Sequence, residues 1–372
     1  MRRKIRLGID VRDLRLASTG TKTYLEEFIR EASLLSSDVE LIQLDSLWKP
    51  YWGNSKWGKA LEHVNFFIWK QLTLPFKCHA LRLDVVFCSD YYVPLIKGKA
   101  KKVVVFHDAL FFDHPEYYNP LWLKLFKWIA LPAARKVDAI IVPSHFSKER
   151  LVHFEPLFAE KIRVVPQGAK SFPNTTTVVS AASKLAIDKL KGRPYFLHVG
   201  VLEKRKNLAF LVEAFAAFRK KQDACLVLVG RPNPKIFNNS YEEVLRTVQE
   251  NQLEDHVIFA GYLRDEDLPH WYTHARAYIF PSRYEGFGIP VLEAFHFETP
   301  VAVANNSCLL EIGGDAVMAF SPDDPAGLVR VMHTLFEDEE VRTDLIQKGK
   351  LRYSLYTWKA AAREILEICH SL

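Results

Sequence analysis

Short apolar runs alternate with longer amphipathic segments along the whole chain. In the first half, the pattern predicts strands at 5–10, 39–44, 84–89, 102–106, 139–143 and 162–166, with helices between several of them, for example at 21–33, 121–134 and 144–154. Short apolar strands that alternate with helices are typical of parallel sheets covered on both faces. The first half is therefore predicted to be an α/β domain on a parallel sheet.

The same alternation starts again after residue 184. Strands are predicted at 195–199, 225–229, 256–260, 277–280 and 301–304, and helices at 207–221, 241–252, 265–275, 289–297, 325–336 and 357–370. The polar, weakly patterned stretch 168–184 is interpreted as a linker. We expect two doubly wound parallel-sheet domains, 1–183 and 184–354, followed by a terminal segment, 355–372. Because such sheets bind ligands at the carboxyl ends of their strands, we expect the two domains to face each other across a cleft.

Composition favours a folded protein in a reducing compartment. The chain has 372 residues, of which 49% are hydrophobic and 25% charged, which is enough for two cores and unlike a disordered chain. Its five cysteines are odd in number and scattered without metal-ligand spacing, which favours the cytoplasm. The basic N-terminus has too short an apolar run for a signal peptide, and no apolar run is long enough to span a bilayer.

Charge is shared unevenly between the two halves. Residues 1–183 carry 27 Lys and Arg against 18 Asp and Glu, whereas residues 184–372 carry 23 against 26. A basic half suits an anionic membrane or an anionic substrate. No nucleic-acid-binding motif accompanies it, so nucleic acid is not expected as a partner.

The most specific chemistry lies in residues 281–293, which read Pro-Ser-Arg-Tyr-Glu-Gly-Phe-Gly-Ile-Pro-Val-Leu-Glu. Seven residues separate Glu285 from Glu293, and between them Gly286, Phe287 and Gly288 lead into a predicted helix. Backbone N–H groups at a helix start favour a phosphate, and carboxylates accept hydrogen bonds from pairs of hydroxyls. A glycine turn before a capped helix would show similar residues, so the motif alone also fits a structural role.

Two further segments follow predicted strands. Gly200 opens the sequence Gly-Val-Leu-Glu-Lys-Arg-Lys-Asn, in which Arg205 and Lys206 suit a diphosphate, although a solvated charged turn looks the same. Tyr262 follows the strand at 256–260 and suits either a base pocket or a packed turn. Position in the chain does not separate these alternatives.

In this order, the segments resemble retaining glycosyltransferases of family 4, which have the GT-B fold of two Rossmann-like domains and a C-terminal helix that returns to the N-terminal domain. The resemblance is strongest from residue 195 to 325. Gly20 and Thr21 resemble the family's first phosphate-side loop, and His107 resembles its acceptor-side histidine. The chain departs from the family pattern at Val201, where some members carry an Arg, at Gln167, where many have an Asn, and at Glu298, where a small residue is usual.

The resemblance implies a retaining, metal-independent transfer of a hexosyl group, of mannosyl, rhamnosyl or glucosyl type. The donor would be a GDP, UDP or dTDP sugar, with no separate cofactor, and the acceptor a saccharide hydroxyl in cell-surface polysaccharide or glycolipid synthesis. Arg205 and Lys206 would hold the diphosphate, Glu285 the sugar and Glu293 the ribose, while His107 would orient the sugar or the acceptor. A sugar-nucleotide epimerase, a phosphorylase of this build, and a non-catalytic sugar-nucleotide-binding subunit remain alternatives.

Aromatic and basic residues are mixed in residues 48–77 and 121–128. The first segment holds four tryptophans and five lysines against one acid: Trp48, Trp52, Trp57 and Trp69, with Lys49, Lys56, Lys59, Lys70 and Lys77. Such segments suit a membrane interface, and an amphipathic core helix with a basic face fits equally well. An interfacial role would make the protein peripheral on the inner face of the membrane, with a lipid-linked saccharide as acceptor.

Overall fold

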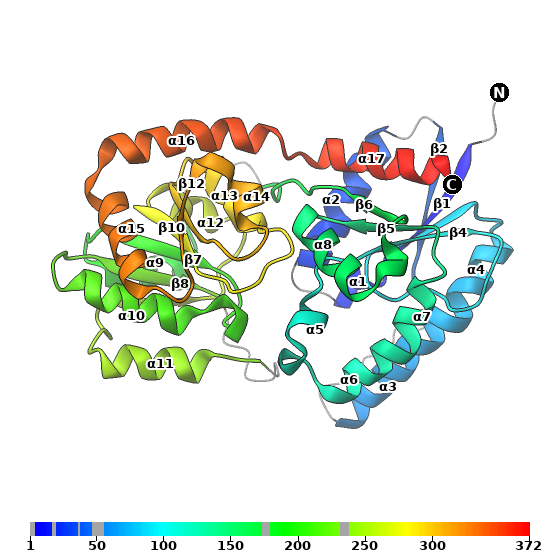
Figure 1. Cartoon of the computed structure of the whole chain (residues 1–372), viewed down its shortest axis with the longest axis horizontal. Coiled ribbons are helices and arrows are strands. Elements are labelled where there is room, and N and C mark those ends of the chain that lie inside the picture. Colours follow the sequence, from blue (N-terminus) through cyan, green and yellow to red (C-terminus); the bar gives the residue numbers. More distant parts are fainter. Residues whose placement is uncertain (1–3, 17–19, 36–37, 47–55, 173–178, 231–237) are drawn as a thin grey trace. The chain divides into compact units, whose positions relative to one another are not determined.

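The computed structural model describes residues 4–16, 20–35, 38–46, 56–172, 179–230 and 238–372. Its contacts divide the chain into two compact units (Figure 1). The first unit comprises Met1–Asp113, Asn119–Gln167 and Trp358–Leu372, and the second comprises His114–Tyr118 and Gly168–Thr357. The chain therefore leaves the first unit, builds the second, and returns for its last segment.

The first unit is built on a parallel six-stranded sheet. Its strands are β1 (Ile5–Asp10), β2 (Val39–Leu44), β3 (Val85–Cys88), β4 (Lys101–Val105), β5 (Ala139–Val142) and β6 (Ile162–Val164). They lie in the order β2-β1-β3-β4-β5-β6, and all neighbouring pairs are parallel. The direction of strand addition reverses between β1 and β3, which is where sheets of this kind place a ligand.

Helices follow most of these strands. They are α1 (Asp13–Leu16), α2 (Gly20–Leu35), α3 (Lys56–Ile68), α4 (Leu74–Ala80), α5 (Leu110–Asp113), α6 (Pro120–Leu125), α7 (Leu131–Ala134), α8 (His145–Phe154) and α17 (Trp358–Ser371). The π-helical turn η1 (Trp69–Thr73) joins α3 to α4, and η3 (Phe126–Ala130) joins α6 to α7. α8 begins after Ser144, whose hydroxyl caps the helix by accepting a hydrogen bond from the Ser147 N–H.

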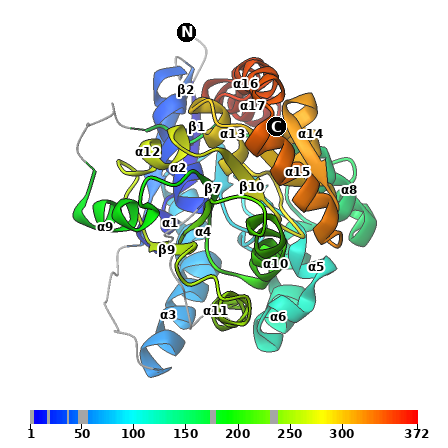
Figure 2. The same ribbon diagram turned by 90° about the vertical axis from the view of Figure 1, so that its left-hand side faces the viewer.

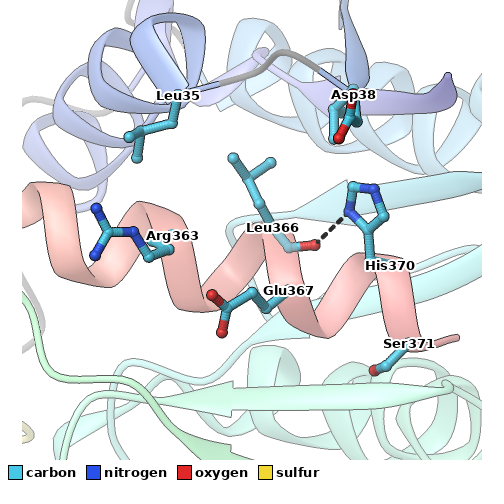
Figure 3. Close-up of a pocket in the computed structure, with 8 residues that line it drawn as sticks. Leu35, Asp38, Arg363, Leu366, Glu367, His370 and Ser371 are labelled. Atoms are coloured by element: carbon cyan, nitrogen blue, oxygen red, sulfur yellow. Dashed lines mark hydrogen bonds between the residues drawn. The ribbon is translucent and has the colours of Figure 1, made fainter.

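The terminal helix α17 completes the core of the first unit. Trp358, Ile365 and Cys369 are buried in one cluster with residues of α2 and of the sheet. A surface pocket of about 390 Å³ lies between α17, the end of α2 and the start of β2, and Figure 3 shows Arg363 and Glu367 at its wall. The helix therefore packs against the part of the chain that comes first in sequence.

The second unit has its own parallel six-stranded sheet. Its strands are β7 (Tyr195–Val199), β8 (Cys225–Val229), β9 (Val257–Gly261), β10 (Ala277–Phe280), β11 (Val301–Ala304) and β12 (Val317–Phe320). They lie in the order β12-β11-β10-β7-β8-β9. Successive side chains of β7 enter different cores, since Tyr195 and Leu197 belong to one hydrophobic cluster and Phe196 to another. Both faces of the sheet are therefore covered.

The helices of the second unit form these two covers (Figure 2). Side chains of α9 (Ala181–Leu190), α12 (Leu268–Thr273), α13 (Ile289–His296) and α14 (Leu309–Gly313) pack in the first cluster. Those of α10 (Leu208–Arg219), α11 (Tyr241–Glu250), α15 (Pro325–Glu337) and α16 (Glu339–Ser354) contribute to the second. This arrangement leaves the carboxyl edge of the sheet to the loops.

The predicted α/β fold with two parallel sheets is confirmed. The structure adds elements that the sequence pattern did not predict, among them α3 and α4 in the first unit and β12, α9, α14 and α16 in the second. Residues 181–184 belong to α9 rather than to a linker, because Ser180 caps that helix by accepting from the Ser183 N–H, while 173–178 lie outside the described residues. Among the described residues, no helix is both long and apolar enough to cross a bilayer.

Candidate functional site

Two loops follow neighbouring strands at the carboxyl edge of the second sheet. β7 and β10 are adjacent, with β8 and β9 on one side and β11 and β12 on the other, so the strand order reverses between them. Ligands of doubly wound sheets bind at this reversal. The loop after β7 covers residues 200–207, and the loop after β10 covers residues 281–288. The first loop carries Arg205 and Lys206, and the second carries Glu285.

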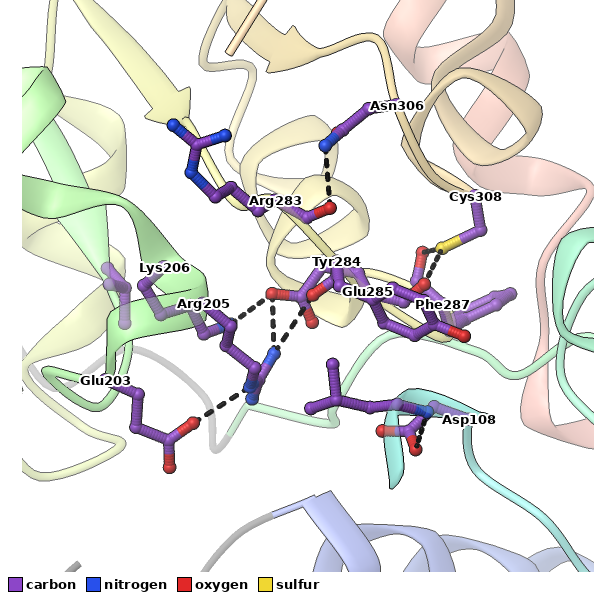
Figure 4. A network of polar contacts seen from close by, with 12 residues as sticks. Asp108, Glu203, Arg205, Lys206, Arg283, Tyr284, Glu285, Phe287, Asn306 and Cys308 are labelled. Carbon is purple, nitrogen blue, oxygen red and sulfur yellow. Dashed lines mark hydrogen bonds and ion pairs between the residues drawn. The ribbon is translucent and has the colours of Figure 1, made fainter. Parts of the chain in front are cut away.

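Glu285 is buried between two cations (Figure 4). Its Oε1 accepts a hydrogen bond from Lys206 Nζ at 2.6 Å and pairs with Arg205 Nη1 at 2.8 Å. Burial opposes ionisation, but Arg205 and Lys206 outweigh it and lower the pKa of Glu285 to about 2. The carboxylate is therefore ionised at neutral pH, and it neutralises part of the positive charge of the loop after β7.

The loop after β7 is held in a fixed shape. Lys204–Lys206 form one 3₁₀ turn, and Asn207 ends it in the left-handed conformation with φ of 56°. Arg205 Nε donates to Glu203 Oε2 at 2.8 Å, and the Arg205 carbonyl accepts from the Arg283 N–H at 2.7 Å. Asn207 Nδ2 donates to the Pro322 carbonyl at 3.1 Å. These bonds fix where Arg205 and Lys206 project.

The glycine loop before α13 depends on the absence of a side chain. Gly288 has φ of 99°, and a Cβ there would lie 2.7 Å from Leu309 Cδ2. The buried Cys308 thiol, which the sequence analysis missed, donates to the carbonyls of Glu285 and Phe287 at 3.1 and 3.2 Å. Both constraints hold the loop at the start of α13, and the N-terminus of a helix favours an anion.

Glu293 lies on α13 in a different electrostatic environment. Its Oε2 accepts a hydrogen bond from Tyr272 Oη at 2.8 Å, a partner that the sequence analysis did not identify. Burial raises the pKa of Glu293 to about 7, although the Tyr272 hydrogen bond and Lys170 act in the opposite direction. The two carboxylates of one motif thus differ in acidity, because Glu285 has two cations in contact and Glu293 has a phenol.

Gly200 and Tyr262 follow β7 and β9 in the same unit. A Cβ on Gly200 would lie 3.2 Å from His198 Nε2 and 3.6 Å from Lys206 Cε, so a larger residue would crowd the His198 ring beside Lys206. Tyr262 is 55% exposed, which leaves its ring accessible from solvent. The predicted roles of these two residues stay predictions.

Three predicted residues belong to the first unit. Gly20 is the exposed first residue of α2, and Thr21 follows it, while residues 18 and 19 of that loop lie outside the described residues. His107 follows β4, and its Nε2 donates to the Ser89 carbonyl at 2.8 Å. Burial lowers the pKa of His107, so the imidazole is neutral at pH 7.

A buried ion group at the β1/β3 reversal of the first sheet was not predicted. Lys70 Nζ lies 2.7 Å from Asp10 Oδ2 and also contacts Asp90. Trp69 Nε1 donates to Asp10 Oδ1 at 3.1 Å. No sequence signal indicates this group, because η1, which carries Trp69 and Lys70, lies 59 residues or more from β1. The group anchors the π-helical turn to the sheet edge.

Metal-ligating side chains and cysteines also bear on the chemistry that the protein can support. Within the described ranges, no three His, Cys, Asp or Glu side chains gather where they would hold a metal ion. The five cysteines are buried and unpaired.

Comparison with family models places known domains on both halves of the chain. Residues 22–170 match the model described as Glycosyltransferase Family 4. Residues 182–352 match the model described as Glycosyl transferases group 1. The second match contains the loops after β7 and β10.

Curated relatives and solved structures agree with these matches. O-antigen chain mannosyltransferase B of Escherichia coli is 26% identical over 273 residues, which cover 73% of this chain and 70% of that protein. Sucrose-phosphate synthase from Thermosynechococcus elongatus has a TM-score of 0.75 at 17% identity over 99% of both chains. Anabaena Alr3699/HepE in complex with UDP-glucose has a TM-score of 0.72 at 17% identity, over 99% of this chain and 100% of that one.

Proposed function

Because the chain belongs to the glycosyltransferases of group 1 and family 4, with the GT-B fold, we propose that it transfers a hexosyl group from a nucleotide diphosphate sugar to a saccharide hydroxyl. The transferred group is of mannosyl, rhamnosyl or glucosyl type, and the product belongs to cell-surface polysaccharide or glycolipid synthesis. The O-antigen mannosyltransferase relative and the neighbour bound to UDP-glucose support this proposal. The observation that carries it is the contact of Glu285 with Arg205 and Lys206 at the β7/β10 reversal.

The donor is assigned to the second domain, residues 184–354. A diphosphate competes with Glu285 for Arg205 and Lys206, since both cations can form charge-assisted contacts with either anion. As the two cations turn to the diphosphate, the Glu285 carboxylate becomes available to the hydroxyls of the sugar. The N–H groups of Gly286, Phe287 and Gly288 add to the stabilisation of the diphosphate, Glu293 binds the ribose, and Tyr262 and Gly200 line the nucleotide.

Transfer proceeds with retention in this proposal. The bond between the anomeric carbon and the diphosphate oxygen breaks, and its electron pair stays on the diphosphate. The acceptor oxygen attacks from the same face, and its proton passes to an oxygen of the departing diphosphate. Arg205 and Lys206 stabilise the developing negative charge, so no metal ion is required. Gly20, Thr21 and the neutral imidazole of His107, all in the domain 1–183, orient the donor and the acceptor.

The acceptor is proposed to be lipid-linked, on the strength of an exposed apolar surface in the first unit. Along α3, η1 and α4 the side chains at three- and four-residue spacing are exposed: Leu61, Val64, Ile68, Leu72 and Phe76. On α6 and η3, Leu121, Leu125 and Trp128 are also exposed. Lys124 Nζ lies 4.7 Å from the centroid of the Trp128 ring. Residues 120–134 contain two lysines and no acid. Apolar and basic side chains together suit an anionic leaflet.

The residues of this exposed surface are not the tryptophans and lysines of 48–77 on which the sequence-based prediction rested. Trp69 and Lys70 are buried and bind Asp10, so they do not face a membrane. Trp48 and Trp52, and the side chain of Trp57, lie outside the described residues. The proposal places the protein peripherally on the cytoplasmic leaflet through α3, α4 and α6.

A donor panel tests the transferase proposal. The chain is incubated with GDP-mannose, UDP-glucose and dTDP-rhamnose, with and without EDTA, and release of the nucleotide diphosphate is measured together with the thermal shift given by each donor. We expect one donor to stabilise the fold and, since no saccharide acceptor is supplied, to be hydrolysed slowly by transfer of its hexosyl group to water in the presence of EDTA. A chain that neither binds nor consumes any of the three refutes the proposal, and activity that EDTA removes and Mn²⁺ restores refutes the metal-free mechanism.

Liposome flotation tests the membrane surface. Wild-type protein is expected to float with vesicles that contain anionic lipid at low salt, and the double variant Leu125→Ser/Trp128→Ser to lose most of that binding. Leu185→Ser is the matched control, because Leu185 is an exposed leucine of the second unit. Equal flotation of all three proteins, or none with wild type, removes the proposal.

A further inference from the structure

A buried phenol contacts the second carboxylate of the motif. Tyr272 Oη donates to Glu293 Oε2 at 2.8 Å, and both side chains are more than nine-tenths buried. Tyr272 lies on α12 and Glu293 on α13, with β10 between them in sequence. The contact therefore depends on the fold and not on a local turn of one helix.

Packing fixes the position of the phenol. The Tyr272 ring stacks on Phe297 with an interplanar angle of 15° and 5.8 Å between centroids, and it packs at 50° against Tyr278. Thr299 Oγ1 donates to the Tyr272 carbonyl at 2.7 Å, which ties the end of α12 to the turn after α13. A glutamate has three rotatable bonds, so a fixed donor on one oxygen removes much of its freedom.

We propose that Tyr272 is a positioning residue that sets Glu293 for the two hydroxyls of the nucleotide's ribose, and thereby selects ribonucleotides over their dideoxy forms. This inference rests on the proposed donor site. An ionised carboxylate offers about four lone-pair positions, and the Tyr272 bond occupies one of them on Oε2. The remaining positions accept hydrogen bonds from the ribose. Without the phenol, the carboxylate keeps its charge but loses its fixed direction.

The same contact gives nucleotide binding a dependence on pH. The groups that act on the pKa of Glu293 are Tyr272 on α12, and Lys170 and Asp265 on loops. Tyr278 on β10 lies near Glu293 as a neutral phenol, because burial and Glu293 raise the pKa of Tyr278. Burial raises the pKa of Glu293 to about 7, while the Tyr272 bond favours the ionised form. Below pH 7 the protonated carboxyl loses an acceptor position, so ribose binding weakens. Removal of the phenol raises this pKa further, and the weakening then begins at higher pH.

The test compares the affinity of UDP and GDP with that of their 2′,3′-dideoxy forms between pH 5.5 and 8.5, by calorimetry on the full chain. The dideoxy forms carry the same phosphates, so they cancel the titration of the ligand. Tyr272→Phe keeps the buried ring and removes only the hydroxyl. Tyr278→Phe is the matched control, since its hydroxyl is also buried but donates to the Val199 carbonyl at 3.3 Å.

We expect Tyr272→Phe to weaken ribonucleotide binding roughly tenfold at pH 8, to shift the pH midpoint upward and to leave dideoxynucleotide binding unchanged. Tyr278→Phe should change neither, and Glu293→Gln should remove the pH dependence. Equal losses for ribo and dideoxy forms, or an unchanged midpoint in Tyr272→Phe, overturn the inference.

Wild-type protein gives a second measurement that needs no variant. Its ribonucleotide affinity must fall below pH 7 relative to its dideoxynucleotide affinity, and parallel profiles overturn the inference. A wild-type chain that binds neither UDP nor GDP refutes the donor site itself and this inference with it. Binding of a ribonucleotide without the predicted preference leaves the donor site standing and refutes only the role of Tyr272.

Discussion

Lys206 Nζ lies 2.6 Å from Glu285 Oε1, although 79 positions separate the two residues in sequence. Arg205 Nη1 reaches the same oxygen at 2.8 Å. The charge of the carboxylate is therefore balanced by the two cations at the carboxyl edge of the sheet. Any anion that binds Arg205 and Lys206 must compete with this carboxylate, which gives substitutions of the acid and of the cations opposite effects on binding.

Glu285→Gln should reduce transfer by about 10²- to 10³-fold while diphosphate binding stays equal or becomes tighter. The amide keeps the shape of the side chain but no longer neutralises Arg205 and Lys206. Steady-state transfer and calorimetric affinity for UDP and GDP give the two numbers. Glu298→Gln is the control, because that glutamate is exposed and pairs with Lys350. Weaker nucleotide binding in Glu285→Gln would contradict the competition.

Lys206→Ala should weaken both transfer and nucleotide diphosphate binding by about tenfold or more, since it removes a charge-assisted donor. Lys204→Ala provides a close comparison, because Lys204 belongs to the same 3₁₀ turn but its side chain is exposed. Calorimetry and donor turnover are measured for both. Equal behaviour of the two variants would mean that general positive charge, and not the position of Lys206, binds the diphosphate.

Gly288→Ala should lower the unfolding free energy by about 1–3 kcal/mol or more, because it combines a positive φ with a contact of 2.7 Å to Leu309 Cδ2. Gly261→Ala separates the two causes, since Gly261 has φ of 68° and no atom within 4 Å of its Cβ position. Gly98→Ala, at a site with neither constraint, should be neutral. Thermal denaturation ranks the three, and any order other than Gly288, Gly261, Gly98 would count against this explanation.

His198 should make the fold less stable as the pH falls from 6.5 to 4. Its Nδ1 donates to the Ile279 carbonyl at 3.0 Å, its side chain is fully buried, and burial lowers its pKa to about 4. Between these pH values the unfolded chain binds a proton that the native chain does not, so the unfolding free energy declines by about 3 kcal/mol at most. Urea denaturation across this range, in wild type and in His198→Gln, measures the slope. An equal slope in both would refute the assignment.

Ile365→Ala should destabilise the first unit by about 2–5 kcal/mol, since Ile365 of α17 is fully buried among residues of α2 and the sheet. Hydrogen exchange is expected to show lost protection in α2 and β1, with the amides of β7 and β8 unchanged. Lys359→Ala alters an exposed position of the same helix and should leave exchange as in wild type. Loss of protection in the second unit alone would contradict this packing.

Local sequence patterns predicted those strands, helices and turns whose residues lie close together in the chain. The apolar runs of β7 and β10 predicted buried parallel strands, and the glycines around Phe287 indicated a turn before a helix. The pattern did not predict β12, a four-residue edge strand with partly exposed side chains, or α16, whose side chains are mostly exposed. Neither element carries the strong alternation of buried and exposed positions on which such predictions depend.

Contacts between distant segments were outside the reach of sequence patterns. The resemblance implied that Arg205, Lys206 and Glu285 serve one donor site, but it did not predict that both cations contact Glu285 Oε1. That contact follows from the adjacency of β7 and β10. Tyr272 and Cys308 have no local sequence pattern that distinguishes them from other core residues. Their hydrogen-bond acceptors, Glu293 and the Glu285 carbonyl, lie about 20 residues away in sequence. The difference in acidity between Glu285 and Glu293 has the same origin, since burial and partners come from the fold.

The return of α17 to the first unit has a consequence for biosynthesis. Trp358, Ala361 and Ile365 fill a core whose other walls come from β1 and α2, near the opposite end of the chain. A ribosome releases β1 and α2 before α17, and most of the second unit is made in between. The apolar surface of β1 and α2 that α17 covers in the folded unit therefore stays exposed until α17 has been synthesised.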